Sequence, residues 1–432
     1  MTSTPIEPSF AELVRTSARI GFLSFGGPAG QIALMQREIV DERGWVEPGA
    51  FLRALNLCHL LPGPEAQQLA TWIGWRLHGV RGGLAAGLLF VIPGALVMLA
   101  LSLLYVLAAG LSWFAALFLG IKAAVLGIVA QALIRVGKRA LGTRFKLALA
   151  AAAFIALTAL DAPFPIVIAV AATIGAVVGR VRPAWLGAHG VAAETAAGPS
   201  RAHLLRSTLA TIAIWSAIWA APMALVAATL GTDHVLWQVG TFFSKLAVVS
   251  FGGAYSVLAY MAQQAVQGMH WLSVGEMADG LGLAETTPGP LIMVTQFVGF
   301  LAGWRDAAPF APWAAATLAA GLTTWVTFAP CFLWIFACAP WMERLERSPA
   351  LQAALAAITA AVVGVIANLA LWFALHVLFA RTLATGLPEL ASFDWRAGLI
   401  AVGAALLLFK WGRGVPLTLA LSALAGLALA AI

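Results

Sequence analysis

The chain has 432 residues, of which 62% are hydrophobic and only 10% are charged. This composition excludes an ordinary soluble globular protein and places the chain in a lipid bilayer. The formal net charge of +7 is weak evidence for an acidic ligand, because excess Lys and Arg in a membrane protein first reflect the orientation of its loops.

Long apolar stretches indicate membrane-spanning helices. Residues 83–110, 112–134, 208–230 and 314–339 each match or exceed the roughly 20 apolar residues that cross the hydrocarbon core. We therefore expect an all-α integral membrane protein with about 10–13 transmembrane segments. The first nine residues hold no basic cluster and no cleavage motif follows them, so we expect no signal peptide.

Two clusters of helix-breaking residues interrupt the first apolar helices. The first cluster, Ser-Phe-Gly-Gly-Pro at 24–28, lies in a helix expected to begin near Ser9 and to resume at residue 29. The second, Leu-Pro-Gly-Pro at 61–64, interrupts a helix that starts at Pro48 and resumes at Glu65. Irregular backbone at membrane depth is tolerated only where it is buried or lines a wet cavity, so both breaks are expected to point inward.

Charged loops predict the orientation of the chain. Five basic residues and no acidic residue lie between positions 135 and 146, which predicts a cytoplasmic loop. The turn that holds Arg37 and Arg43 is then expected on the outside. Two short apolar segments follow, at 147–160 and 165–179, and they are expected to form a tight, tilted pair.

The second half of the chain repeats the first. Both clusters return 226 positions later, as Ser-Phe-Gly-Gly at 250–253 and Thr-Pro-Gly-Pro at 287–290, and Trp45 returns as Trp271. Farther along the offset is 237, and it relates Pro93 to Pro330, Gly127 to Gly364 and Gln131 to Asn368. We expect an N-terminal transmembrane repeat at 1–182, a linker with one extra helix at 183–240, and a C-terminal repeat at 241–432. The extra helix has no counterpart, so the second repeat is expected to be inverted.

Broken helices at equivalent places in two inverted repeats indicate a binding site near the bilayer midplane of a secondary transporter. Half-helices that start after the breaks present free N–H groups and the positive ends of their dipoles, which suit an anion. Alternatively, these residues only kink helices and permit close packing. The candidate substrate-binding residues at the breaks are Ser24, Gly26, Gly27, Pro62, Gly63, Pro64, Ser250, Gly252, Gly253, Pro288, Gly289 and Pro290.

Three basic residues within apolar helices are further candidates for substrate binding. Arg19 and Lys245 are equivalent in the two repeats, and Lys122 lies near the middle of its span. An ionisable group at membrane depth indicates function by default, although a long side chain can instead extend to the membrane interface. Replacing Arg19 or Lys122 by Gln is expected to abolish transport.

Glu65, Glu285 and His59 are candidates for proton coupling. Glu65 opens the half-helix after the second break, where it could also be an ordinary first-turn acid stabilised by the helix dipole. Glu285 is equivalent to His59, and either could take up a proton, although a single His is often structural. The charged residues from Glu38 to Arg43 are expected to form a solvated turn. The three cysteines show no metal-ligand spacing, and no metal or other cofactor is expected.

The sequence resembles the chromate ion transporter family in its long two-domain form. The motifs that carry this resemblance are Phe-Gly-Gly-Pro at 25–28, Trp45 with the charged turn before it, Leu-Pro-Gly-Pro at 61–64, Gly-Ile-Lys at 120–122, and the second-copy motifs at 251–253 and 287–290. The resemblance implies a bacterial inner-membrane protein that exports chromate, with sulfate as a competitor, and that is driven by membrane ion gradients. The second copy has Ala254 and Leu291 where the first has proline and Glu65, so only its glycines and prolines carry over.

Other functions stay open at this stage. The same fold could take up or exchange sulfate or a related oxyanion, and an anion channel would conduct faster than a carrier. A membrane enzyme would need clustered acids or histidines such as His-Glu-x-x-His, and the sequence has none, so an enzyme is not expected. It also has no Walker A motif, so ATP is not expected to drive transport. The expected partners are a small oxyanion and the bilayer, with no nucleic acid, and a homodimer stays open.

Overall fold

A computed structural model describes residues 7–25, 27–108, 110–186, 201–251, 254–342, 345, 348–381 and 388–430. The elements named within these ranges are all helical, apart from one isolated β-bridge between Phe379 and Phe393. Six described helices are long and apolar enough to cross a membrane. The protein is therefore an all-α integral membrane protein, as predicted.

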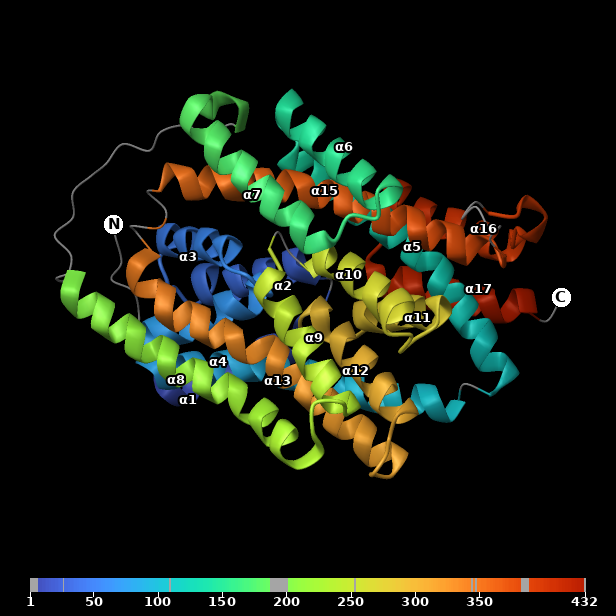
Figure 1. Ribbon diagram of the computed structural model, residues 1–432, viewed down its shortest axis with the longest axis horizontal. Coiled ribbons are helices and arrows are strands. Elements are labelled where there is room, and N and C mark those ends of the chain that lie inside the picture. The colour runs from blue at the N-terminus through green and yellow to red at the C-terminus, as the bar shows by residue number, and fades with distance from the viewer. Residues whose placement is uncertain are drawn as a thin grey trace.

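The described helices are grouped by the sequence copy in which their residues lie. The first copy contains α1 (Phe10–Leu23), α2 (Gly27–Met35), η1 (Gln36–Asp41), α3 (Pro48–Leu60), α4 (Glu65–Ala108), α5 (Ser112–Ala140), α6 (Arg144–Ala159), α7 (Phe164–Val181) and η2 (Pro183–Leu186). The second contains α9 (Val235–Val249), α10 (Ala254–Gln263), η3 (Gln264–Gly268), α11 (Val274–Thr286), η4 (Leu291–Met293), α12 (Val294–Arg305), α13 (Pro312–Cys338), η5 (Ala339–Trp341), α15 (Pro349–Leu378), η6 (Leu390–Ser392), α16 (Trp395–Ala405), η7 (Leu406–Lys410) and α17 (Val415–Ala430). Between them, α8 (Arg201–Leu230) packs against α13 and α9 at the edge of the molecule (Figure 1).

The first break is the tip of a hairpin rather than an interruption within a continuous span. If α2 continued along the axis of α1, Arg19 and Glu38 would be roughly 28 Å apart at 1.5 Å per residue. Instead, Arg19 Nη2 lies 3.5 Å from Glu38 Oε1. The segment formed by α2 and η1 therefore runs back beside α1, which corrects the expected interrupted helix.

The second copy folds back at the same place. Trp271, which follows η3, stacks on Phe243 of α9 with ring centroids 6.3 Å apart, and it also contacts Phe242. Phe242 and Phe243 precede the break at Ser250, and Trp271 lies well after it. The chain therefore leaves the break and returns to the level of residues that precede it, as in the first copy.

A second turn follows the Pro-Gly-Pro break of each copy. Inside α4, His78 and Gly79 leave the helical conformation, with φ of 60° at Gly79, and divide the helix into two arms. Gly74 approaches Gly82, and Thr71 approaches Gly87, so residues 65–77 and 80–108 are antiparallel. The equivalent pair in the second copy is α12 and α13, which are likewise joined by a short turn.

The copies exchange their last helices. The backbone of Ala353 on α15 is approached by Gly175 of α7, while that of its equivalent Ala116 on α5 is approached by Gly426 of α17. Likewise α15 packs against α6, and α5 against α16. A contact pattern that is preserved when the copies are exchanged is the signature of a two-fold relation. Both α6 and α7 pack mainly against α15 and much less against each other, so they do not form the expected tight pair (Figure 1).

Equivalent helices of the two copies run in opposite directions. The second arm of α4 and α13 correspond at the 237-residue offset, and they pack against each other. Gly83 of α4 contacts Phe336 of α13, and Gly87 contacts Phe332. One position rises by four as the other falls by four, so the pair is antiparallel.

Candidate functional site

The Pro-Gly-Pro turn of each copy binds the Ser-Phe-Gly-Gly break of the other. The Gly63 N–H donates to the Ser250 carbonyl oxygen at 3.0 Å, and the Gly289 N–H donates to the Ser24 carbonyl oxygen at 2.8 Å. These two bonds are equivalent at the 226-residue offset. We call these four residues the tip crossing. Backbone groups that a helix break frees at membrane depth need partners, and here the opposite copy supplies them.

Glycine is required at the centre of each Pro-Gly-Pro turn. The φ angles are 115° at Gly63 and 87° at Gly289, in the left-handed region that other residues rarely adopt. A methyl group on Gly63 would also come within 2.9 Å of the Cys331 thiol. The prolines on both sides remove N–H donors that would have no helical partner at this depth. The sequence motif therefore specifies the crossing directly.

The second arm of α4 distinguishes the two ends of the molecule. It passes the tip crossing at Phe90 and Gly94, which pack against Gly289. On one side of that level, the His78 ring contacts the Phe10 ring at the start of α1. On the other side, Tyr105 contacts Asp279. We call the end near His78 the basic end and the other the far end.

A cavity of about 390 Å³ lies between the tip crossing and the basic end. Gly27 and Gly63 line it at the breaks, and α5 and α15 form two of its walls. Its polar and charged lining residues are His59, Glu65, Gln131, Arg135, Arg139, Lys146, Glu285 and Thr359. The cavity is therefore bounded by both copies and by charged groups of both signs.

The cavity has the features of an anion site. Two helices begin at it, α2 at Gly27 and α4 at Glu65, so their N-terminal dipole ends are close by. Arg135, Arg139 and Lys146 add three cationic side chains on its basic side. The Nη2 atom of Arg139 lies 3.5 Å from His59 Nε2, which connects these cations to the Pro-Gly-Pro turn. A multivalent oxyanion is the ligand chemistry that such a set favours.

The structure brings most of the predicted site residues together. Those that line the cavity are Gly27, His59, Gly63, Glu65 and Glu285. Those at or beside the tip crossing are Ser24, Pro62, Pro64, Ser250, Pro288, Gly289 and Pro290, all of them buried. Those outside the cavity lining are Arg19, Lys122 and Lys245, while Gly26, Gly252 and Gly253 lie outside the described residues. The helix breaks therefore gather at one place, and the three basic residues of the apolar helices do not join them.

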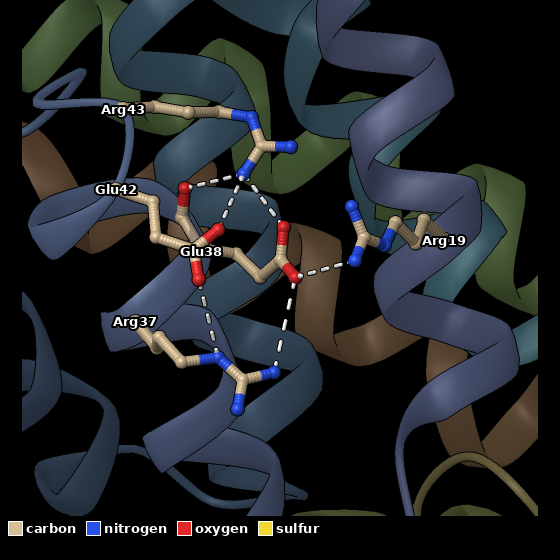
Figure 2. Close-up of polar contacts among 5 residues, drawn as sticks. All are labelled: Arg19, Arg37, Glu38, Glu42 and Arg43. Carbon is tan, nitrogen blue, oxygen red and sulfur yellow. Dashed lines mark hydrogen bonds and ion pairs between the residues drawn. The ribbon is translucent and has the colours of Figure 1, made fainter.

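Arg19 belongs to a charge network that fixes the first hairpin. Figure 2 shows Arg19, Arg37 and Arg43 around the carboxylate of Glu38, at N–O distances of 3.5, 3.9 and 2.6 Å. The Glu38 side chain is 1% exposed, contrary to its expected place in a solvated turn. Because Arg19 comes from α1 and Glu38 from η1, the pair ties the two arms of the hairpin together. The fold also places Arg37 and Arg43 toward the basic end, opposite to the expected side.

Lys122 also has a carboxylate partner. Its Nζ lies 3.4 Å from Asp279 Oδ1 of α11, and the Tyr105 hydroxyl donates to Asp279 Oδ2 at 2.7 Å. This trio lies at the far end, about 20 Å along α5 from Arg135 at the helical rise per residue. Lys122 and the cavity are therefore on opposite sides of the tip crossing.

Sequence reasoning missed Arg135, Arg139, Lys146 and Asp279. The three basic residues were expected only as an orientation signal, because a loop count does not show that α5 and α6 carry them into a cavity. Asp279 had a clearer signal, since it is a carboxylate within the otherwise apolar segment 277–284. Comparison of the two copies did not point to Asp279, because the equivalent residue of the first copy is Arg53 and not an acid.

Comparison with known proteins gives a consistent picture. The family described as Chromate transporter matches residues 11–176 and 237–427. A chromate transport protein of Pseudomonas aeruginosa is 32% identical over 370 residues, covering 84% of this chain and 81% of the relative. A chromate transport protein of Cupriavidus metallidurans is 29% identical over 417 residues, covering 96% and 92%. An uncharacterized transporter of Methanocaldococcus jannaschii is 24% identical over 373 residues, or 86% of each chain. No solved structure matches this chain.

Proposed function

Because the chain belongs to the chromate transporter family, we propose that it is a secondary transporter that exports chromate from the cytoplasm of a bacterium across the inner membrane. The observation that carries the proposal is the cavity of about 390 Å³ beside the tip crossing, with Arg135, Arg139 and Lys146 in its wall. Chromate and sulfate are both tetrahedral dianions with similar hydrogen-bonding surfaces. Sulfate should therefore compete for the same site.

The basic end is assigned to the cytoplasm. Lys and Arg concentrate in cytoplasmic loops, and the basic end holds the charged segment 135–146 together with Arg37 and Arg43. The antiparallel packing of α4 and α13 supports a second repeat that is inverted across the bilayer, with α8 as the extra crossing. In this orientation the cavity faces the cytoplasm, as a site that loads an exported solute should.

The membrane potential can supply the driving force. Moving one charge across 100 mV changes its free energy by about 2.3 kcal/mol. The free energy of a dianion therefore falls by about 4.6 kcal/mol when it leaves an inside-negative cell. A proton gradient is the second candidate source. Glu65, Glu285 and His59 line the cavity and are the candidates to carry the proton. Their position in the substrate cavity would couple proton binding to anion binding directly.

Everted membrane vesicles test the proposal. They expose the cytoplasmic face, so chromate export appears as uptake of labelled chromate. We expect saturable uptake, inhibition by sulfate and stimulation by an imposed voltage that is positive inside the vesicle. Imposing a pH gradient at zero voltage then measures proton coupling. Uptake of sulfate into right-side-out cells, without chromate uptake into everted vesicles, would instead support the alternative of sulfate import or exchange.

A further inference from the structure

The trio at the far end joins the two copies. Lys122 and Tyr105 belong to the first copy, on α5 and α4, whereas Asp279 belongs to the second copy, on α11. Asp279 is 4% exposed, and its Oδ1 atom accepts no hydrogen bond. Glu276, three positions earlier on the same helix, is paired with Arg305 of α12. The Lys122–Asp279 ion pair therefore links α11 to the long helix α5 of the other copy.

The position equivalent to Lys122 lines the cavity. Lys122 corresponds to Thr359 at the 237-residue offset, and Thr359 is part of the cavity wall on α15. The same offset relates Ile128, another lining residue, to Val365, which is 1% exposed. At the far end, Val365 is buried and Lys122 is paired with Asp279.

Inverted repeats allow the second state of the cycle to be inferred. Two copies related by a two-fold axis can exchange conformations, which closes one end and opens the other around the same midplane site. After such an exchange, Lys122 would occupy the place that Thr359 has now, and Val365 that of Ile128. The far-end cavity would then have a lysine where the basic-end cavity has a threonine.

We propose that a second oxyanion site forms at the far end when the Lys122–Asp279 pair opens, and that Lys122 then contacts the departing oxyanion. This rests on the proposed transport function. In the closed state the Asp279 carboxylate is paired with the Lys122 ammonium group. In the open state the oxyanion takes the place of that carboxylate. A buried charge that loses its partner is strongly destabilising, so Lys122 favours opening only when a solute anion is present. Asp279 keeps the hydrogen bond from Tyr105.

The residues of the Lys122–Asp279 pair differ from those at their equivalent positions in the opposite copy. The equivalent of Asp279 in the first copy is Arg53, and the equivalent of Lys122 is Thr359, so no such acid–base pair can form at the basic end from these positions. The far end therefore has an ion pair between the copies that the equivalent positions, Arg53 and Thr359, do not provide at the basic end. This difference fits a carrier that waits open to the cytoplasm and opens outward only when loaded.

The test combines a reporter cysteine with charge exchange. In a Val365→Cys chain, a membrane-impermeant thiol reagent applied from the far-end side labels position 365, and peptide mass analysis measures the rate. Asp279→Asn should raise that rate about tenfold or more, because it weakens the pair. The double exchange Lys122→Asp with Asp279→Lys should return the rate to that of the parent chain. It should not restore chromate uptake, because position 122 then carries an acid.

Two further variants and one measurement on the parent chain make the result decisive. Lys122→Arg keeps the cation and should retain both closure and uptake, which covers the case in which the double exchange fails to fold. Arg305→Gln breaks a nearby ion pair within one copy and should change neither readout more than about twofold. Chromate should raise labelling of the parent chain.

Two results would overturn the inference. Recovery of chromate uptake by the double exchange would make the pair a structural tie only, with no ligand role for Lys122. Unchanged labelling in Asp279→Asn would show that the pair does not hold the far end closed. If the parent chain itself takes up no chromate, the proposed function fails instead, and that outcome is distinct from both.

Discussion

The two Pro-Gly-Pro turns have the same sequence and the same bond to the opposite copy, but they differ in what surrounds them. Gly63 lines a cavity of about 390 Å³, whereas Gly289 is packed against Phe90 and Gly94. Identical local chemistry thus has an open and a closed environment in one molecule. The cavity therefore depends on how the copies are placed against each other, and not on the turn itself.

The long helices α5 and α15 extend this contrast. Arg135 and Arg139 of α5 face the cavity, and their equivalents on α15 are Trp372 and His376. The copies therefore share a backbone plan but carry different charges at their two ends. In the proposed orientation, a strong cationic site near the cytoplasm and a weaker one at the exit would let an anion bind from a low concentration and then leave.

The largest expected effect comes from forcing the closed turn apart. A methyl group on Gly94 would collide with the Pro288 carbonyl oxygen, and backbone cannot move aside cheaply. Gly94→Ala should destabilise the protein by about 1–3 kcal/mol and abolish chromate uptake. Thermal unfolding of the purified protein and vesicle uptake measure both. Gly321→Ala is the matched control, since a methyl group there meets no atom within 4 Å; equal effects of the two changes would contradict the packing described here.

The cationic wall should give the next largest effect. Arg139→Gln removes a charged donor from the cavity, which at about 1.5–3 kcal/mol per charged hydrogen bond predicts a roughly 10- to 100-fold loss of chromate affinity. Lys138→Gln removes a neighbouring charge that does not line the cavity and should change the affinity less than about twofold. Chromate binding to purified protein measures the two constants. Similar losses in both variants would indicate a general charge effect rather than a site.

Proton coupling should respond to one carboxylate of the cavity. Glu65→Gln keeps the size of the side chain but removes its ability to bind and release a proton. We expect uptake driven by a pH gradient to fall at least about fivefold, while uptake driven by voltage alone stays within about twofold of the parent. Vesicles with separately imposed gradients give both rates. A parallel fall of the two rates would assign Glu65 to substrate binding or stability instead.

The smallest effect is expected at Arg19. Its side chain is 56% exposed and lies outside the cavity lining, so its pairing with Glu38 contributes at most about 1 kcal/mol. Arg19→Gln should lower chromate uptake by less than about threefold, in contrast to the loss expected from the sequence alone. Uptake normalised to the amount of protein in the membrane measures this. Complete loss of uptake by properly inserted protein would return Arg19 to the binding site.

Much of the fold was accessible from the sequence. The apolar stretches, the fixed offsets and the Gly and Pro clusters predicted an all-α membrane protein, and they located the breaks that form the tip crossing. These signals work because backbone requirements at membrane depth leave few residue choices. The expected direction of the chain after each Ser-Phe-Gly-Gly break was wrong, since a Gly-Gly pair specifies a turn but not its angle.

The charged part of the site was less accessible. Hydropathy and motif spacing cannot show which arginine faces a cavity, because that depends on helix rotation and on packing between distant segments. Glu38 and Arg19 illustrate this, since a hairpin brings them together and buries Glu38. Asp279 and Lys122 are 157 positions apart, and only the interlocking of the copies makes them partners.

The most direct test measures from which side of the membrane the cavity is accessible and whether chromate occupies it. Gln131 lines the cavity between the tip crossing and the basic end, so Gln131→Cys places a thiol in its wall. A membrane-impermeant thiol reagent is applied separately to everted vesicles and to intact spheroplasts, and peptide mass analysis measures the labelling of position 131 apart from that of Cys58, which also lines the cavity. We expect labelling from the cytoplasmic side and protection by chromate. Labelling from the periplasmic side alone, or labelling that saturating chromate does not slow, would contradict it.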